Sequence, residues 1–310
     1  MSRKVAVLKG GTSAEREVSL VSGAACAAAL REAGFKVTEI DVTNDVGALL
    51  DALSKPRPDV VFNALHGRWG EDGCIQGLLE LLRLPYTHSG VMASAIAMDK
   101  QMTKHLVAAH GVTSPEGIVV RRADLLKGEP MERPYVIKPL REGSSVGVRI
   151  VPVGDNRPLF EGTDWAESDD LLVERFIEGR ELTVSVMGDR PLAVTEIRPR
   201  QGFYDYAAKY TDGKADHLVP APLPKSVTAA ALDSARRAHE ALGCRGVSRS
   251  DFRYDDTRVK NGDAGELYFL EVNTQPGMTP LSLVPEQAAH LGISFSQLCT
   301  WIVENAACDS

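Results

Sequence analysis

Hydrophobic and polar positions form short alternating blocks over the first ninety residues. The apolar runs have the length of buried strands and lie at 4–9, 35–40, 59–65 and 84–86. Two stretches with helical spacing lie between them, an Ala-rich one at 14–33 and a shorter one at 72–83, and Thr12 with Glu15 forms a possible capping box for the first. Strands and helices that alternate in this way predict a parallel sheet covered on both faces.

The pattern changes near residue 93, where a helix is expected at 98–110 and strand-like runs then predominate. The runs lie at 117–120, 135–138, 148–151, 171–176, 182–187, 191–197, 247–254 and 266–273, with helices at 226–242, 285–291 and 295–306. This mixture predicts α+β architecture with an antiparallel sheet. We therefore expect an N-terminal α/β domain at 1–95 and two α+β domains at 96–180 and 181–310.

Residues 199–225 show no periodicity and contain four prolines. A structureless loop of this length inside a compact domain is usually functional or disordered. We expect this segment to be either a functional lid or a disordered loop.

Composition narrows the class of protein. The 310 residues carry a net charge of -7, and 44% of them are apolar, which excludes a disordered or collagen-like chain. The acidic balance argues against a nucleic-acid partner, and no apolar run is long enough to predict a membrane span. The five cysteines are scattered without metal-ligand spacing, so we expect reduced thiols in a cytoplasmic protein.

Polar side chains share one face of two late strands. Period-two alternation places Arg249 and Asp251 on one face of the run 247–254, and Glu271 and Asn273 on one face of the run 266–273. If the strands pair, two carboxylates and an amide oxygen converge as a hard oxygen site suited to magnesium carrying nucleotide phosphates. The alternative is a solvated strand face with a salt bridge to Arg249.

A second candidate for phosphate binding is Lys138, at the end of an apolar strand, with the loop 141–147. The loop offers glycines, hydroxyl groups and free N–H groups, although a plain surface hairpin is the alternative. The chain contains no Walker A motif, and 10–13 is not a dinucleotide fingerprint.

Together these segments resemble the D-alanine–D-alanine ligase family of the ATP-grasp superfamily. The resemblance runs essentially end to end and rests on 10–19, 65–73, 98–100, 136–147, 172–174, 181–184, 204–210, 249–251, 270–277 and 282–285. It implies an N-terminal α/β domain and two α+β domains that clamp ATP. It also implies ATP-dependent joining of two D-alanines through a D-alanyl phosphate, for peptidoglycan precursors, by a homodimer.

The same resemblance implies a role for each matching residue. Catalysis is expected from Glu15, Ser144, Tyr210 and Arg249. ATP is expected to contact Lys100, Lys138, Ser145, Glu174, Phe176, Ile177, Glu181 and Lys209. D-alanine is expected at Glu15, His66, Ser282 and Leu283, and two Mg²⁺ or Mn²⁺ ions at Asp251, Glu271 and Asn273.

Three other functions compete with this interpretation. Another ATP-grasp ligase would share Asp251, Glu271 and Asn273. The residues that favour D-alanine are Glu15, Ser144, Tyr210 and Ser282. A catalytically inactive nucleotide-binding protein is disfavoured by the intact metal ligands. A nicotinamide-dependent Rossmann enzyme lacks its glycine fingerprint.

The resemblance also predicts which nucleophile the enzyme prefers. Tyr210 should favour the amine of D-alanine over the hydroxyl of D-lactate, as tyrosine does there in dipeptide-forming ligases. Tyr210→Phe should therefore shift the ratio of kcat/KM values for D-alanine and D-lactate towards D-lactate. An unchanged ratio would count against this role.

Overall fold

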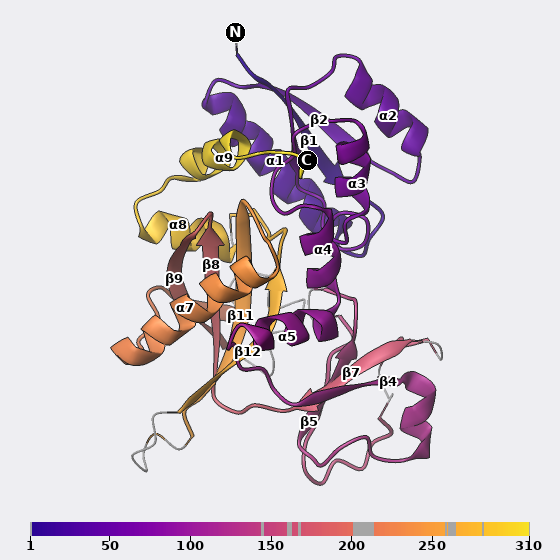
Figure 1. The fold of residues 1–310 in the computed structure, drawn as a ribbon, viewed down its shortest axis with the longest axis vertical. Helices are drawn as coiled ribbons and strands as arrows, with labels where there is room; N and C mark the ends of the chain where they lie inside the picture. Colours follow the sequence, from indigo (N-terminus) through magenta and orange to yellow (C-terminus); the bar gives the residue numbers. More distant parts are fainter. Residues whose placement is uncertain are drawn as a thin grey trace.

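The computed structural model describes residues 2–143, 146–159, 163–166, 169–200, 214–257, 259, 265–280 and 282–309. These residues contain three β-sheets, which lie one after another along the longest axis of the molecule (Figure 1). Within the same residues, no helix combines the length and apolar character needed to cross a membrane.

The first sheet is parallel, as the alternating pattern predicts, with strand order β2-β1-β3. Its elements are β1 (Lys4–Gly10), α1 (Arg16–Glu32), β2 (Lys36–Val42), α2 (Val46–Ser54), β3 (Val60–Asn63) and α3 (Cys74–Leu81). The predicted capping box is wrong, because α1 begins at Arg16 with Glu15 as its N-cap and no side chain caps it. The expected strand at 84–86 is reduced to isolated bridges from Tyr86 to Val61 and Ala307.

The second sheet is antiparallel, with strand order β4-β7-β5-β6. It is formed by β4 (Gly117–Arg121), β5 (Tyr135–Pro139), β6 (Arg149–Val151) and β7 (Asp170–Arg175), with the 3₁₀ helix η1 (Arg122–Lys127) beside it. Two helices precede it, α4 (Val91–Met98) and α5 (Lys100–Ala109), where one was expected. Asp99 separates them, since its side chain accepts a hydrogen bond from the Met102 N–H (3.1 Å) and caps α5.

The third sheet is also antiparallel, with strand order β10-β9-β8-β11-β12. It comprises β8 (Arg180–Met187), β9 (Arg190–Pro199), β10 (Ala215–Leu218), β11 (Val247–Asp255) and β12 (Glu266–Asn273), and α7 (Lys225–Ala241) packs on it. The expectation of a structureless segment at 199–225 is wrong for β10. This strand is short, half-buried and at the sheet edge, so it lacks the apolar run that marks central strands. Residues 201–213 of the expected lid lie outside the described residues.

The chain ends against its first sheet. After α8 (Leu283–His290), the last helix α9 (Phe295–Glu304) lies beside α1 (Figure 1). Buried Cys299 and Ile302 join the core formed by Val5, Val7 and Leu30. The closing helix therefore packs on elements of the N-terminal sheet as well as on α8, its neighbour in the sequence.

A short connection links β7 to β8, and Gly179 brings it close to β11. Gly179 has φ +96°, and a Cβ there would overlap the Tyr254 carbonyl oxygen. Gly34 has a similar φ of +90° but open space around it. Gly34→Ala should therefore cost about 1 kcal/mol of unfolding free energy for its backbone alone. Gly179→Ala should cost about 1–3 kcal/mol more because of the overlap.

Denaturant unfolding of both glycine variants measures this difference. Equal losses of stability would contradict the predicted contact between Gly179 and β11.

Candidate functional site

Two cavities meet between the sheets. The first encloses about 930 Å³ and is lined by residues from all three, including Glu15, His66, Glu71, Lys100, Arg249, Asn273, Ser282 and Leu283. The second encloses about 810 Å³ and is lined mainly by Val136, Lys138, Val148, Glu174, Phe176, Ile177, Glu181, Arg253 and Leu270. Lys100, Glu142, Gly143, Asp251 and Glu271 line both. These five residues mark where the cavities join.

The polar face predicted from strand alternation lies at this junction. β11 and β12 pair antiparallel, with Arg249 opposite Asn273 and Asp251 opposite Glu271. Arg249 donates to both carboxylate oxygens of Asp251, from Nε at 2.9 Å and Nη2 at 2.8 Å. Thr183 Oγ1 on β8 also donates to Asp251, at 2.6 Å. The Asp251 carboxylate is thereby held facing the cavities.

The donor set at the junction fits a hard cation. Asp251 and Glu271 provide carboxylate oxygens, and Asn273 Oδ1 accepts a hydrogen bond from the Gln275 N–H at 2.8 Å, which orients its oxygen. Among the described residues, no cluster of three or more His, Cys, Asp and Glu side chains is arranged as a metal site. A metal here would therefore need the amide oxygen of Asn273 and oxygen ligands from a bound molecule such as a nucleotide phosphate.

Lys100 projects into the junction from the start of α5. Its Nζ donates to the Glu142 carbonyl oxygen (2.5 Å) and lies 3.6 Å from Glu271 Oε2. Burial lowers the pKa of Lys100 below its ordinary value, although Glu271 partly offsets this effect. A cation removed from bulk water at the junction of the two cavities is well placed to attract phosphate oxygens.

A second group of charges lies behind the junction. The Glu174 carboxylate on β7 forms ion pairs with both Lys138 and Lys104, and all three side chains are almost fully buried. Burial alone would raise the pKa of Glu174, but the two lysines hold it below its ordinary value. Burial lowers the pKa of Lys104 to about 8. Two cations against one carboxylate give the group a net positive charge, and Lys138 and Glu174 of this group line the second cavity.

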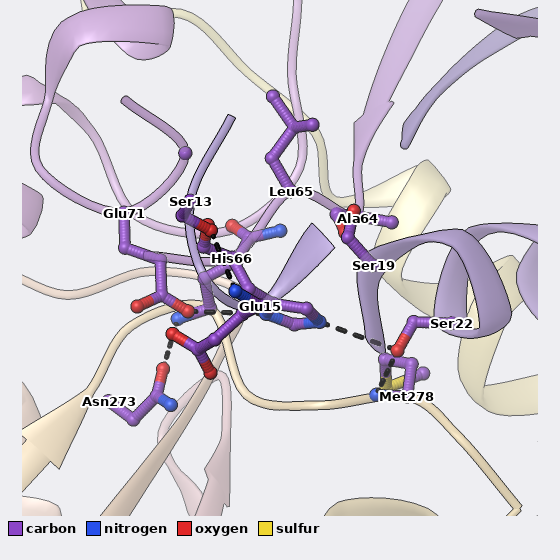
Figure 2. Close-up of polar contacts among 12 residues, drawn as sticks. Ser13, Glu15, Ser19, Ser22, Ala64, Leu65, His66, Glu71, Asn273 and Met278 are labelled. Atoms are coloured by element: carbon purple, nitrogen blue, oxygen red, sulfur yellow. Dashed lines mark hydrogen bonds and ion pairs between the residues drawn. The ribbon is translucent and has the colours of Figure 1, made fainter. Parts of the chain in front are cut away.

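Charged side chains of the N-terminal sheet line the far side of the first cavity. His66 Nδ1 lies 3.2 Å from Glu71 Oε1, and its Nε2 lies 3.4 Å from Ser22 Oγ. Figure 2 shows the Glu15 carboxylate pointing towards Asn273, beside His66. This end of the cavity is therefore acidic and suits an ammonium group.

The opposite wall is the start of α8. Ser282 is its N-cap residue and lines the cavity with Leu283. Ser282 Oγ accepts a hydrogen bond from the Thr279 N–H (2.9 Å), which orients the hydroxyl. A helix N-terminus presents unpaired N–H groups and suits a carboxylate.

Comparison with known proteins identifies the family. The model of the D-ala D-ala ligase N-terminus matches residues 48–89, and that of the D-ala D-ala ligase C-terminus matches residues 107–304. The D-alanine–D-alanine ligase of Parvibaculum lavamentivorans is 57% identical over 310 residues, 99% of each chain. That of Rhodospirillum rubrum is 56% identical and is matched over the whole of both chains. The chain belongs to the D-alanine–D-alanine ligase family.

Solved structures of the family share the fold. The D-alanine–D-alanine ligase of Bacillus anthracis, complexed with ATP, aligns with a TM-score of 0.80 at 30% identity, over 98% of this chain and 97% of that one. The VanG D-Ala:D-Ser ligase of Enterococcus faecalis aligns with a TM-score of 0.78 at 29% identity, over 98% and 99%. The ATP-grasp architecture implied by the sequence motifs is thereby confirmed.

The predicted site residues of this ligase chain fall into two groups. Fourteen of them line the two cavities, and Glu15 is the one with two predicted roles: Glu15, His66, Lys100, Lys138, Glu174, Phe176, Ile177, Glu181, Arg249, Asp251, Glu271, Asn273, Ser282 and Leu283. Ser144, Ser145, Lys209 and Tyr210 lie outside the described residues, so their roles remain predictions.

Sequence reasoning missed Lys104, Glu71 and Thr183. Lys104 could have been found, because it lies four residues after Lys100 and therefore on the same helix face. Glu71 pairs with His66 in the same loop, and Thr183 on β8 bonds to Asp251 on β11. Neither contact follows a helix or strand period, so the sequence pattern does not reveal it.

Two serines that interrupt the expected apolar pattern of β11 face away from the site. Ser248 and Ser250 are fully buried on the side opposite Arg249 and Asp251, as period-two alternation predicts. Ser248 Oγ lies 2.7 Å from His239 Nδ1 on α7. These serines therefore belong to the buried face of the sheet, where Ser248 contacts α7, and not to the site.

The His66–Glu71 contact predicts how a substitution changes a titration. Burial lowers the pKa of His66, but Glu71 and Glu15 favour the imidazolium and raise the pKa above its ordinary value overall. Glu71→Gln removes one of these negative charges and keeps the burial, so the pKa of His66 should fall. An NMR titration of the imidazole signals measures the shift.

His239 provides the internal control for this titration, since burial holds its pKa at about 4 away from Glu71. An unchanged or higher pKa of His66 in Glu71→Gln would contradict the proposed electrostatic pairing.

Proposed function

We propose that this chain uses ATP to join two D-alanine molecules into D-alanyl-D-alanine, releasing ADP and phosphate. One observation carries the proposal. The face formed by Arg249, Asp251, Glu271 and Asn273 lies where two cavities of different character meet. A phosphate-transfer reaction between a nucleotide in one cavity and an amino acid in the other requires such a junction.

The second cavity has the properties of a nucleotide site. Apolar walls from Val136, Phe176 and Leu270 suit a flat base, and Lys100 and Lys138 offer positive charge towards the junction. Glu181 lines the same cavity and would accept hydrogen bonds from ribose hydroxyls. ATP bound there directs its γ-phosphate towards Asp251 and Glu271.

The first cavity has opposite chemistry at its two ends, and this separates the substrates. Glu15, near His66, binds the ammonium group of the first D-alanine, whose carboxylate then points to the junction. The N-terminus of α8, with Ser282 and Leu283, binds the carboxylate of the second D-alanine. Its amine is thereby directed at the carbonyl carbon of the first.

The reaction then has two balanced steps. A carboxylate oxygen of the first D-alanine attacks the γ-phosphorus of ATP, and the bond to ADP breaks. The amine of the second D-alanine attacks the resulting acyl phosphate, loses a proton, and phosphate leaves with the original carboxylate oxygen. Arg249 neutralises the oxyanion that develops at the carbonyl carbon.

Magnesium belongs to the proposal as the ion that accompanies the nucleotide. Asp251, Glu271 and Asn273 would hold one or two such ions, and Mn²⁺ has the same preference for oxygen ligands. When bound, the ion offsets negative charge on the phosphates. Arg249 and Thr183 contribute by keeping the Asp251 carboxylate directed at the junction.

The setting of the enzyme follows from the same proposal. ATP and free thiols point to the cytoplasm, and all five cysteines are unpaired. We also propose a homodimer, for which the exposed Leu81 and Met92 on neighbouring helices α3 and α4 offer apolar surface. Light scattering on the purified protein distinguishes a dimer from a monomer.

Isotope transfer tests the reaction itself. With ATP, Mg²⁺ and D-alanine labelled with ¹⁸O in its carboxylate, each dipeptide formed should release one phosphate that carries ¹⁸O. Phosphate without ¹⁸O would contradict the acyl phosphate, and no release above the background with ATP alone would contradict the ligase. D-serine and D-lactate in separate reactions define the second substrate.

Arg249→Met should reduce kcat by about 10²–10³-fold, because it removes the charge opposite the developing oxyanion. Arg31→Met is the matched control, since this exposed arginine on α1 forms an ion pair with Glu39 on the surface and lines neither cavity. Equal kcat values for Arg249→Met and Arg31→Met would exclude a catalytic role for Arg249.

A further inference from the structure

Arg253 lies on β11, two residues beyond Asp251, and no step of the proposed reaction uses it. Its side chain reaches across to the connection that joins β7 to β8. Nε donates to the Ile177 carbonyl oxygen (3.1 Å), and Nη2 donates to the Gly179 carbonyl oxygen (2.8 Å). One guanidinium group thus binds two carbonyl oxygens of the same short connection.

The same guanidinium also faces the side chains on either side of these carbonyls. Its Cζ lies 5.9 Å from the centre of the Phe176 ring, and its Nη1 lies 3.6 Å from Glu181 Oε2. Phe176, Ile177 and Glu181 all line the second cavity, as does Arg253 itself. Arg253 therefore contacts the Phe176 ring and the Glu181 carboxylate, and it binds the backbone carbonyl of Ile177.

The third sheet also contacts both ends of this connection, at Arg175 and at Gly179. Tyr268 on β12 accepts a hydrogen bond from Arg175 Nη2 (2.8 Å), and the Arg175 guanidinium lies 5.1 Å from the centre of its ring. Gly179 packs directly against the Tyr254 carbonyl group. Arg253 lies between these two contacts, so it determines the path of the segment that faces the cavity.

The burial of Arg253 makes these contacts strong. Its side chain is 18% exposed and that of Glu181 is 14% exposed, so water competes little for their hydrogen bonds. Lysine could keep the charge beside Glu181, but it lacks the planar fork that donates to two oxygens at once. The geometry therefore depends on arginine and not only on positive charge.

We propose that Arg253 is a positioning residue of the nucleotide site, which holds the connection Phe176–Gly179 and the Glu181 carboxylate in the arrangement that binds the nucleoside. This inference rests on the proposed function, in which the second cavity binds ATP. It goes beyond that function by assigning nucleoside affinity to a side chain on β11, the strand that also carries Asp251.

The proposal predicts which part of the nucleotide loses affinity. Arg253 contacts the segment that faces the base and the ribose. Arg253→Met should therefore weaken the binding of ADP and of a non-hydrolysable ATP analogue by the same factor. We expect about a tenfold rise in Kd for both, which corresponds to about 1.4 kcal/mol. KM for ATP should rise similarly, while kcat at saturating ATP stays within about twofold, since the contacts are equal in ground and transition states.

Calorimetric titration of the full-length chain with ADP and with the ATP analogue measures both Kd values directly. Arg253→Lys should bind both nucleotides with intermediate affinity, and it serves if the methionine variant does not fold. Arg236→Met is the control, because this arginine pairs with Asp233 and Glu240 along α7, away from both cavities. It should bind both nucleotides like the unmodified chain.

Three results would overturn the assignment. They are unchanged Kd values in both Arg253 variants, a loss confined to the ATP analogue, and a fall in kcat as large as the rise in KM. Direct binding also separates this inference from the proposed function. A chain that binds nucleotides but releases no D-alanine-dependent phosphate would refute the ligase activity and leave the Arg253 comparison intact.

Discussion

The pairing of β11 with β12 is the constraint on which the site depends. In this register Asp251 lies opposite Glu271, and Arg249 lies opposite Asn273. A shift of one residue would turn these side chains of one strand to the opposite face. Buried Phe252 and Phe269, edge to face at 5.7 Å, oppose such a shift, because it would expose an aromatic ring.

Local pairing explains how an acidic chain binds an anionic substrate. The net charge of -7 is spread over the whole sequence. Near the cavities, each buried cation is held by a carboxylate, as Lys138 is by Glu174 and Arg249 is by Asp251. Such pairs orient the cations and offset part of the cost of removing them from water. In the proposed reaction, the triphosphate and its metal would add further charges to a network that already exists.

The sequence supports some of these features more firmly than others. Alternation along one strand is local, so the sequence predicts that Arg249 and Asp251 share a face. Their convergence with Glu271 and Asn273 also required the assumption that the two strands pair. The helix predicted at 98–110 corresponds to α5, whereas α4 was missed because its sequence is almost continuously apolar and shows little helical periodicity. The edge strand β10 was missed because it lacks an apolar run, and α2 was also absent from the prediction. The contacts of Arg253 with a connection some seventy residues earlier are tertiary and leave no periodic signal.

The central claim is that nucleotide and amino acid meet at the Asp251–Glu271 face. A crystal structure of the chain with a non-hydrolysable ATP analogue, Mg²⁺ and D-alanine tests it most directly. The account predicts the base against Phe176 and Ile177, the terminal phosphate with metal beside Asp251 and Glu271, and an amino-acid ammonium at Glu15. A nucleotide bound elsewhere, or a terminal phosphate pointing away from these two carboxylates, would contradict it.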